Sequence, residues 1–168
     1  MAMPAPRWKD NVSALDPSER RQWIAVLPIG AHEQHGPHLP AETDTIIAEG
    51  LVERTIRNLP RSLPVTFLPT EPVGYSVEHL DFPITRSLSY GEAVERWLGI
   101  AKELSALGIR KMVLFNAHGG NAPLMTIVTT EARIRFNMLL SPRAGPVSAN
   151  RKALSTLPTR QSTSTAAR

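Results

Sequence analysis

Short apolar runs alternate with longer amphipathic stretches along the chain, and this pattern predicts strands and helices in turn. Strands are predicted at residues 23–29, 64–69 and 111–116, with a fourth beginning at 138–140. Helices are predicted at 16–22, 45–58, 91–107 and 122–136. Regular alternation of this kind indicates an α/β fold, with a parallel sheet that carries helices on both faces.

Several predicted helices carry recognisable end signals. Asp44 is placed as the N-cap of the helix at 45–58, and Asn121 as the N-cap of the helix at 122–136. Gly108 is expected to end the helix at 91–107. The helix at 45–58 is expected to bury a stripe that includes Ile47 and Leu51.

The composition fits one domain with a hydrophobic core in a reducing compartment. The chain has 168 residues and no cysteine, which excludes disulfides and thiolate metal ligands. Its longest apolar run, at 23–29, is too short to cross a bilayer, so no membrane association is expected. The first ten residues lack the apolar region of a secretory signal, and we expect a cytoplasmic protein.

Positive charge is concentrated near the C-terminus. Five of the 19 basic residues and none of the 15 acidic ones follow Ser141, which leaves 14 basic against 15 acidic residues at 1–140. We therefore divide the chain into a domain at 1–140 and a basic tail at 141–168. The tail is rich in Ser, Thr, Pro and Arg, and we expect it to be disordered. It has no aromatic residue, so nucleic-acid binding is an unfavoured alternative.

The stretch "LPIGAHEQHGPHLPAETD", at residues 27–44, is the densest concentration of histidine and carboxylate in the chain. His32 and His35 are three residues apart, whereas the helical metalloprotease motif needs a spacing of four. Pro37 and Pro40 prevent a continuing helix, so the stretch is predicted to be a rigid loop. In an extended segment, Glu33 and His35 point to the same side.

Two further residues complete a candidate metal site. Asp44 lies where the loop meets the next helix, and His118 follows the predicted strand at 111–116. Ligands of open parallel sheets bind at the carboxyl ends of the strands, where both motifs are expected. Imidazole and carboxylate groups suit Zn, Mn or Fe, and such ions acidify a bound water.

Each motif also has a simpler interpretation. A histidine-rich loop can be only polar surface, although that would leave His118 unexplained. The segment at 116–121 can equally be a helix-capping turn. Residue types and spacing leave these alternatives open.

At these residues the chain resembles the creatininase (creatinine amidohydrolase) family. The resemblance rests on residues 27–44, on "GYSVEHLDFPIT" at 74–85 and on "NAHGGN" at 116–121, and it covers about residues 8–140. It implies a three-layer α/β/α fold with a mostly parallel sheet, a homo-oligomer, and two divalent ions of Zn or Mn, with Fe as an alternative. The implied activity is hydrolysis of a non-peptide or cyclic amide C–N bond, in creatinine or a related small amide, by metal-bound hydroxide.

The resemblance also implies roles for individual residues. Glu33 and His118 match ligands of one ion, His35 matches a ligand of the other, and Asp44 matches the bridging carboxylate. The loops implied to line the substrate side contain Ser76, Glu78, Gly119, Gly120 and Asn121.

No residue is assigned as catalytic. His38 and His79 match no ligand; each is a candidate for hydrogen bonding to a ligand carboxylate, with simple packing as the alternative.

Two departures from the family pattern qualify this interpretation. Gly120 stands where creatininase has a carboxylate that binds the second ion, so we expect one tightly bound ion here. Nothing after Leu140 resembles the family's downstream "HAGE"-type segment, which handles protons, and we expect a chain truncated or frame-shifted after about residue 140. The alternative function is therefore a catalytically impaired family member that binds metal or partners without turnover.

Overall fold

A four-stranded parallel sheet forms the centre of the computed structural model, which describes residues 15–144. The strand order is β2-β1-β3-β4, and all three neighbouring pairs are parallel. The strands are β1 (Ile24–Ile29), β2 (Val65–Phe67), β3 (Lys111–Asn116) and β4 (Leu139–Ala144). The predicted strands are confirmed in number and order.

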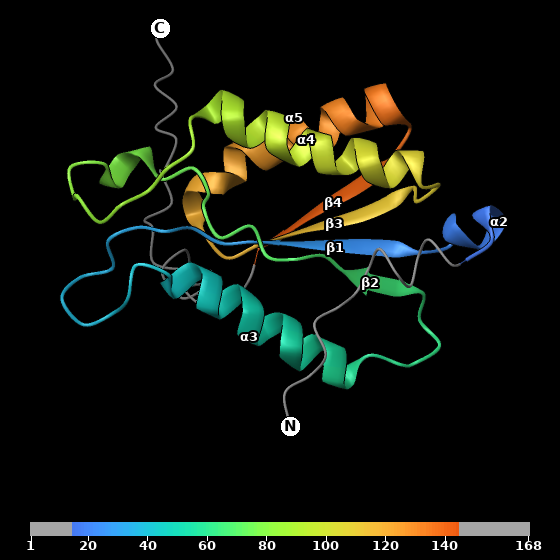
Figure 1. Cartoon of the computed structure of the whole chain (residues 1–168), viewed down its shortest axis with the longest axis horizontal. Coiled ribbons are helices and arrows are strands. Elements are labelled where there is room, and N and C mark those ends of the chain that lie inside the picture. Colours follow the sequence, from blue (N-terminus) through green and yellow to red (C-terminus); the bar gives the residue numbers. More distant parts are fainter. Residues whose placement is uncertain (1–14, 145–168) are drawn as a thin grey trace, which may run out of the picture.

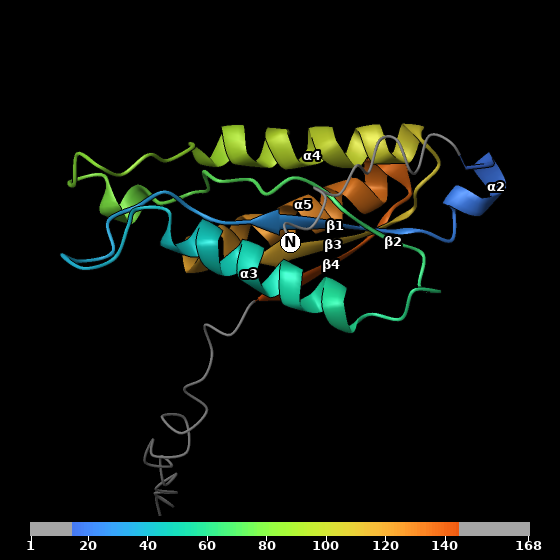
Figure 2. The same cartoon turned by 60° about the horizontal axis from the view of Figure 1, so that its bottom comes forward.

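Helices cover both faces of this sheet. The α-helices are α2 (Pro17–Arg20), α3 (Thr43–Asn58), α4 (Tyr90–Ala106) and α5 (Ala122–Phe136), and two short 3₁₀ helices are η1 (Val77–His79) and η2 (Gly119–Asn121). Figure 1 shows α4 and α5 on one side of the sheet and α3 on the other. The turned view in Figure 2 shows the same three layers, which confirms the predicted α/β/α fold.

The main core lies between the sheet and the α4–α5 pair. Trp97 and Leu104 of α4 are completely buried and belong to the same cluster as Leu27 of β1 and Leu114 of β3. Helix α4 begins with a capping box, in which the Ser89 hydroxyl accepts from the Glu92 amide and the Glu92 carboxylate accepts from the Ser89 amide. Its end at Gly108, where φ is 93°, is as predicted.

The α3 face of the sheet is less completely packed. Ile47, predicted to be buried, is 39% exposed, whereas Thr45 and Ala48 are buried. The error arises because α3 approaches the sheet through its first turns. Its C-terminal half leaves an apolar cavity of about 230 Å³ against the sheet, lined by Ile24, Val26, Val52, Thr55, Leu59, Leu63, Val65, Phe67, Val113 and Phe115.

One predicted helix cap and one boundary require correction. Glu42, not Asp44, is the N-cap of α3, so Asp44 lies in the first turn with its carboxylate free for other contacts. Asn121 is the N-cap residue of α5, as predicted, although its side chain makes no capping hydrogen bond. Strand β4 extends to Ala144, past the predicted boundary at 140, and the rest of the predicted tail lies outside the described residues. None of the helices in the described part is long and apolar enough to span a membrane.

The topology determines where a ligand site can form. The connection from β1 leads through α3 to β2 on one side, and β3 lies on the other side of β1. The carboxyl ends of β1 and β3 therefore form the switch point of the sheet, where open α/β sheets bind ligands. The loops after these two strands contain the histidines singled out in the sequence.

Candidate metal centre

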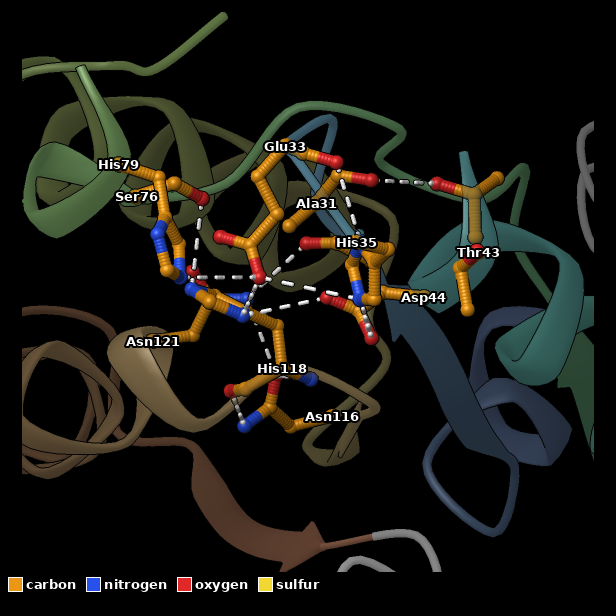
Figure 3. A network of polar contacts seen from close by, with 12 residues as sticks. Ala31, Glu33, His35, Thr43, Asp44, Ser76, His79, Asn116, His118 and Asn121 are labelled. Carbon is orange, nitrogen blue, oxygen red and sulfur yellow. Dashed lines mark hydrogen bonds and ion pairs between the residues drawn. The ribbon is translucent and has the colours of Figure 1, made fainter. Parts of the chain in front are cut away.

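Glu33, His35, Asp44 and His118 converge at this switch point (Figure 3). His118 Nδ1 lies 3.2 Å from Glu33 Oε1 and 3.1 Å from Asp44 Oδ2. His35 Nε2 lies 3.4 Å from Asp44 Oδ1 and 3.9 Å from Glu33 Oε1. The first three residues come from the segment between β1 and the first turn of α3, and His118 comes directly after β3.

The loop itself presents His35 in the orientation of a ligand. The Glu33 amide donates to the carbonyl of Ala41 at 3.0 Å, which closes the loop. His35 Nδ1 lies 3.0 Å from the Glu33 carbonyl, which can only accept, so Nδ1 carries a proton. The Nε2 lone pair therefore faces the carboxylates, as in metal-binding histidines whose other ring nitrogen donates to a carbonyl.

His118 is oriented in the same manner from the other side. Its Nε2 lies 3.0 Å from the Tyr75 carbonyl and 3.3 Å from Ser76 Oγ, so Nε2 carries the proton. Its Nδ1 then faces two carboxylate oxygens. A lone pair directed at carboxylates is repelled by them, so this position calls for a cation, either a proton on Nδ1 or a metal ion.

The buried carboxylates support a metal ion at this position. Glu33 and Asp44 are only 5% and 7% exposed. Glu33 Oε2 is buried without a hydrogen-bond partner, and the buried Asp44 Oδ2 has only its contact with His118 Nδ1 at 3.1 Å. Buried charges are normally paired or bind metals. Two carboxylates and two imidazoles, with no thiolate, are a donor set that fits Zn or Mn.

The pKa of His118 is raised above its ordinary value. Burial of the ring is the largest single effect and lowers this pKa, but the Asp44 contact, the charges of Glu33 and Asp44 and the Tyr75 carbonyl together raise it. Below this raised pKa, the metal-free protein holds a proton on Nδ1, at the edge of the ring that faces the two carboxylates.

Asparagine side chains hold the loops around the site together. Asn121 is completely buried; its amide group donates to the Gly30 carbonyl at 3.1 Å and to Asn116 Oδ1 at 3.0 Å, and its oxygen accepts from the Tyr75 amide at 2.8 Å. Asn116 Oδ1 also accepts from the His118 amide at 3.1 Å. Asn121 therefore connects three loops; its place in a loop on the substrate side, which the family resemblance implies, stays a prediction.

The other predicted residues lie at different distances from the cluster. Ser76 is completely buried beside His118, and His79 Nε2 lies 4.0 Å from Glu33 Oε1. His38 is exposed and makes no polar contact with the cluster. The hypothesis that it orients a ligand carboxylate therefore has no support in the structure, because its loop points it into solvent.

The ligand atoms form two overlapping groups in the described part of the chain. One consists of Glu33, His35 and Asp44, and the other of Glu33, Glu78 and His118, with atoms within 4.8 Å of one another in each. Glu33 is common to both groups, while the two Asp44 oxygens face two different histidines. The bridging role of Asp44 stays a prediction. The sequence did not predict Glu78 as a possible metal ligand, because residue spacing does not show that the loop containing Glu78 reaches His118.

Comparison with known proteins identifies relatives that hydrolyse amides. The family model for creatinine amidohydrolase matches residues 10–167. The mycofactocin precursor peptide peptidase of Mycobacterium tuberculosis is 37% identical over 107 residues, which are 60% of this chain and 42% of the relative. The 2-amino-5-formylamino-6-ribosylaminopyrimidin-4(3H)-one 5'-monophosphate deformylase of Methanobrevibacter smithii is 33% identical over 131 residues, which are 73% of this chain and 54% of the relative. The chain thus spans about half the length of these relatives.

Solved structures show the same fold. A creatininase structure described as the manganese form has a TM-score of 0.58 at 24% identity, and the match covers 80% of this chain and 55% of that one. A zinc form of a creatininase mutant has a TM-score of 0.60 at 23% identity over the same shares. The family match over most of the chain, together with this fold, leads to one assignment: the chain belongs to the creatinine amidohydrolase (creatininase) family.

Proposed function

We propose that the chain is a metal-dependent amidohydrolase that cleaves an amide C–N bond in a small molecule. The observation that carries the proposal is the convergence of Glu33, His35, Asp44 and His118, with the buried Glu33 Oε2 left without a hydrogen-bond partner. Membership of the creatininase family supports the reaction class.

These four side chains would hold a divalent ion, for which Zn and Mn are the first candidates. When bound, such an ion polarises a carbonyl oxygen and lowers the pKa of water. The chain's own residues set the conditions for this chemistry. The Tyr75 and Glu33 carbonyls fix the two imidazoles, and the buried Glu33 and Asp44 carboxylates provide negative charge.

Proton transfer to the leaving nitrogen needs a donor near this cluster. His79 is a better candidate than His38, because its Nε2 lies 4.0 Å from Glu33 Oε1 and its side chain is 36% exposed. It can therefore contact both the cluster and a bound molecule. We assign His79 Nε2 as the atom that donates this proton.

The relatives define the amides to be tested. One is named as a peptidase of a precursor peptide, another as a deformylase, and a third, from Pseudomonas putida, as a creatinine amidohydrolase at 28% identity. A peptide bond, a formamide and a cyclic amide are thus the three substrate classes to compare. We further propose a homo-oligomer, since Leu139 of β4 is 68% exposed and Ile134 of α5 is 69% exposed. A cytoplasmic location is proposed from the absence of cysteine, which fits a reducing compartment.

The test is turnover by the purified chain loaded with Mn²⁺ or Zn²⁺, with one substrate from each class. Hydrolysis of any of them, abolished in Asp44→Asn but retained in Glu42→Gln, would support the proposal. Glu42 is a matched control because it lies two residues away and contacts His32, outside the cluster. Equal rates for the wild type and Asp44→Asn would contradict the proposal.

A second candidate is metal binding without turnover. It is favoured by Gly120, which stands where creatininase has a carboxylate that binds the second ion. Tight metal binding with no hydrolysis of any of the three amides would support this second function.

A further inference from the structure

Glu78 directs its carboxylate toward the same histidine that Glu33 and Asp44 approach. It lies on η1, and its Oε1 is 3.6 Å from His118 Nε2, whereas Glu33 and Asp44 face Nδ1 of the same ring. Together with Glu33 and His118 it forms a group whose ligand atoms lie within 4.8 Å of one another. We propose that Glu78 is a ligand of the ion at Glu33 and His118, and that Gly120 is the residue that admits it; this rests on the proposed function.

The space around Gly120 is the first argument. A Cβ atom at this position would lie 2.8 Å from Glu78 Oε1 and 2.5 Å from His118 Nε2, and closer still to the Tyr75 carbonyl oxygen. These separations are shorter than van der Waals contact. A side chain at 120 would therefore clash first with the Tyr75 carbonyl and the His118 ring, and it would also occupy the space into which the Glu78 carboxylate reaches.

The unpaired Glu33 oxygen is the second argument. Glu33 Oε2 is buried without a hydrogen-bond partner, although Glu33 Oε1 already faces His118 and His35. A carboxylate with one oxygen unused can serve a second ion. Glu33 is the member shared by the two groups, so two neighbouring ions would use both of its oxygens.

Other groups already orient the His118 ring, so Glu78 is not needed for that purpose. Tyr75 O at 3.0 Å and Ser76 Oγ at 3.3 Å both lie near Nε2, whereas the 3.6 Å to Glu78 is too long for a hydrogen bond. The Glu78 side chain is 45% exposed, so its carboxylate has room to turn from the Nε2 edge of the ring toward the Nδ1 edge, where Glu33 lies. Its backbone is fixed nearby, because the Tyr75 amide donates to Asn121 and the Ser76 amide to Ser87.

This proposal replaces the expectation, drawn from Gly120 alone, that the chain binds one ion tightly. The test is calorimetric titration of the metal-free protein with Mn²⁺ and with Zn²⁺, with bound metal counted by elemental analysis. The variants are Glu78→Gln, Glu78→Asp and Asp81→Asn. Asp81 is the matched control, because it is an exposed carboxylate three residues further along the same loop and outside both groups.

We expect two ions per chain in the wild type and in Asp81→Asn. Glu78→Gln should retain one ion and bind the other at least about 100-fold more weakly, beyond the 10–100-fold typical of a residue that only orients a ligand. Glu78→Asp should recover part of the lost affinity. Co²⁺ absorption should also change in Glu78→Gln, because the ion loses a carboxylate ligand.

Other results separate the failure of this inference from that of the proposed function. Two ions with unchanged affinity in Glu78→Gln, loss of both ions in that variant, or a single ion in the wild type would each overturn the role of Glu78. The proposed function would survive all three. A wild-type protein that binds no divalent ion would overturn the proposed function as well.

Discussion

His118 Nδ1 lies 3.1 Å from Asp44 Oδ2, although one residue follows β3 and the other begins α3. The two elements meet because β1 and β3 are parallel neighbours, paired from Ile24 with Lys111 to Ile29 with Asn116. Their carboxyl ends therefore lie at the same edge of the sheet. The side chains that follow them make one site from two distant parts of the sequence.

Asp44→Asn should weaken metal binding more than about 100-fold. The variant keeps the size of the side chain but removes the charge that faces both His35 and His118. The loss of metal affinity should exceed the 10–100-fold loss that is typical when a residue that only contacts a ligand is mutated. Competition with a chelator dye measures the affinity, with Glu42→Gln as the control. An affinity within a factor of three of the wild type would rule out Asp44 as a ligand.

The stability of the metal-free protein should depend on pH through His118. Its pKa is raised in the folded state, so the stability from its proton is fully present below about pH 6.5, the ordinary pKa, and is lost as the pH rises through the raised value. Thermal melting with EDTA between pH 5.5 and 9 measures this. The difference in Tm between the wild type and His118→Gln should shrink as the pH rises, and a constant difference would contradict the raised pKa.

Metal binding should show the opposite pH dependence. A metal ion replaces the proton on Nδ1, so affinity should increase as the pH rises toward and past the raised pKa of His118. Titrations with Mn²⁺ at several pH values, in buffers that do not bind metal, measure this change. Affinity that stays flat across the same range would show that His118 is not a ligand.

Asn121→Ala should destabilise the protein strongly. It leaves the Gly30 carbonyl and the Tyr75 amide without their side-chain partner in a buried site, and it removes one of the two hydrogen bonds that Asn116 Oδ1 accepts. Each buried unsatisfied group costs about 1–3 kcal/mol, so a total loss of several kcal/mol is expected. Urea unfolding measures it. The control is Asn58→Ala, which removes one exposed hydrogen bond to the Arg54 carbonyl, and equal losses in the two variants would contradict the structural role of Asn121.

Leu139→Glu should reduce self-association. Leu139 lies on β4, which pairs only with β3 among the described strands, and its side chain is 68% exposed. Open edges and exposed apolar residues favour association, and charge on an edge strand opposes it. Sedimentation velocity at several concentrations measures the change. A monomeric wild type at high concentration would contradict both this prediction and the proposed homo-oligomer.

The order of elements and the approximate site could be predicted because both depend on local pattern. Apolar runs mark β1 and β3, and the rule that parallel strands bind ligands at their carboxyl ends brings the two His-containing loops together. The helical spacing in α4 correctly predicted the burial of Trp97 and Leu104. These features need no knowledge of contacts between distant residues.

The errors concern contacts that the local pattern does not contain. Ile47 was expected in the core because of its helical spacing, but α3 buries Thr45 and Ala48 instead. Asn121 is the N-cap residue of α5, as predicted, but the local pattern does not show that its side chain binds Gly30 and Asn116 instead of the helix amides. The position of Glu78 depends on a long loop that folds back toward His118, and nothing in its sequence gives that path.

The central claim is that Glu33, His35, Asp44 and His118 hold a divalent ion, and anomalous diffraction from crystals grown with Zn²⁺ tests it most directly. Data collected on both sides of the zinc absorption edge locate the ion independently of any assumed chemistry. The account predicts a peak at the carboxyl ends of β1 and β3, about 2.0–2.2 Å from imidazole nitrogens and carboxylate oxygens of these four residues. A fully folded protein with no anomalous peak there, or with zinc bound only elsewhere on its surface, would contradict it.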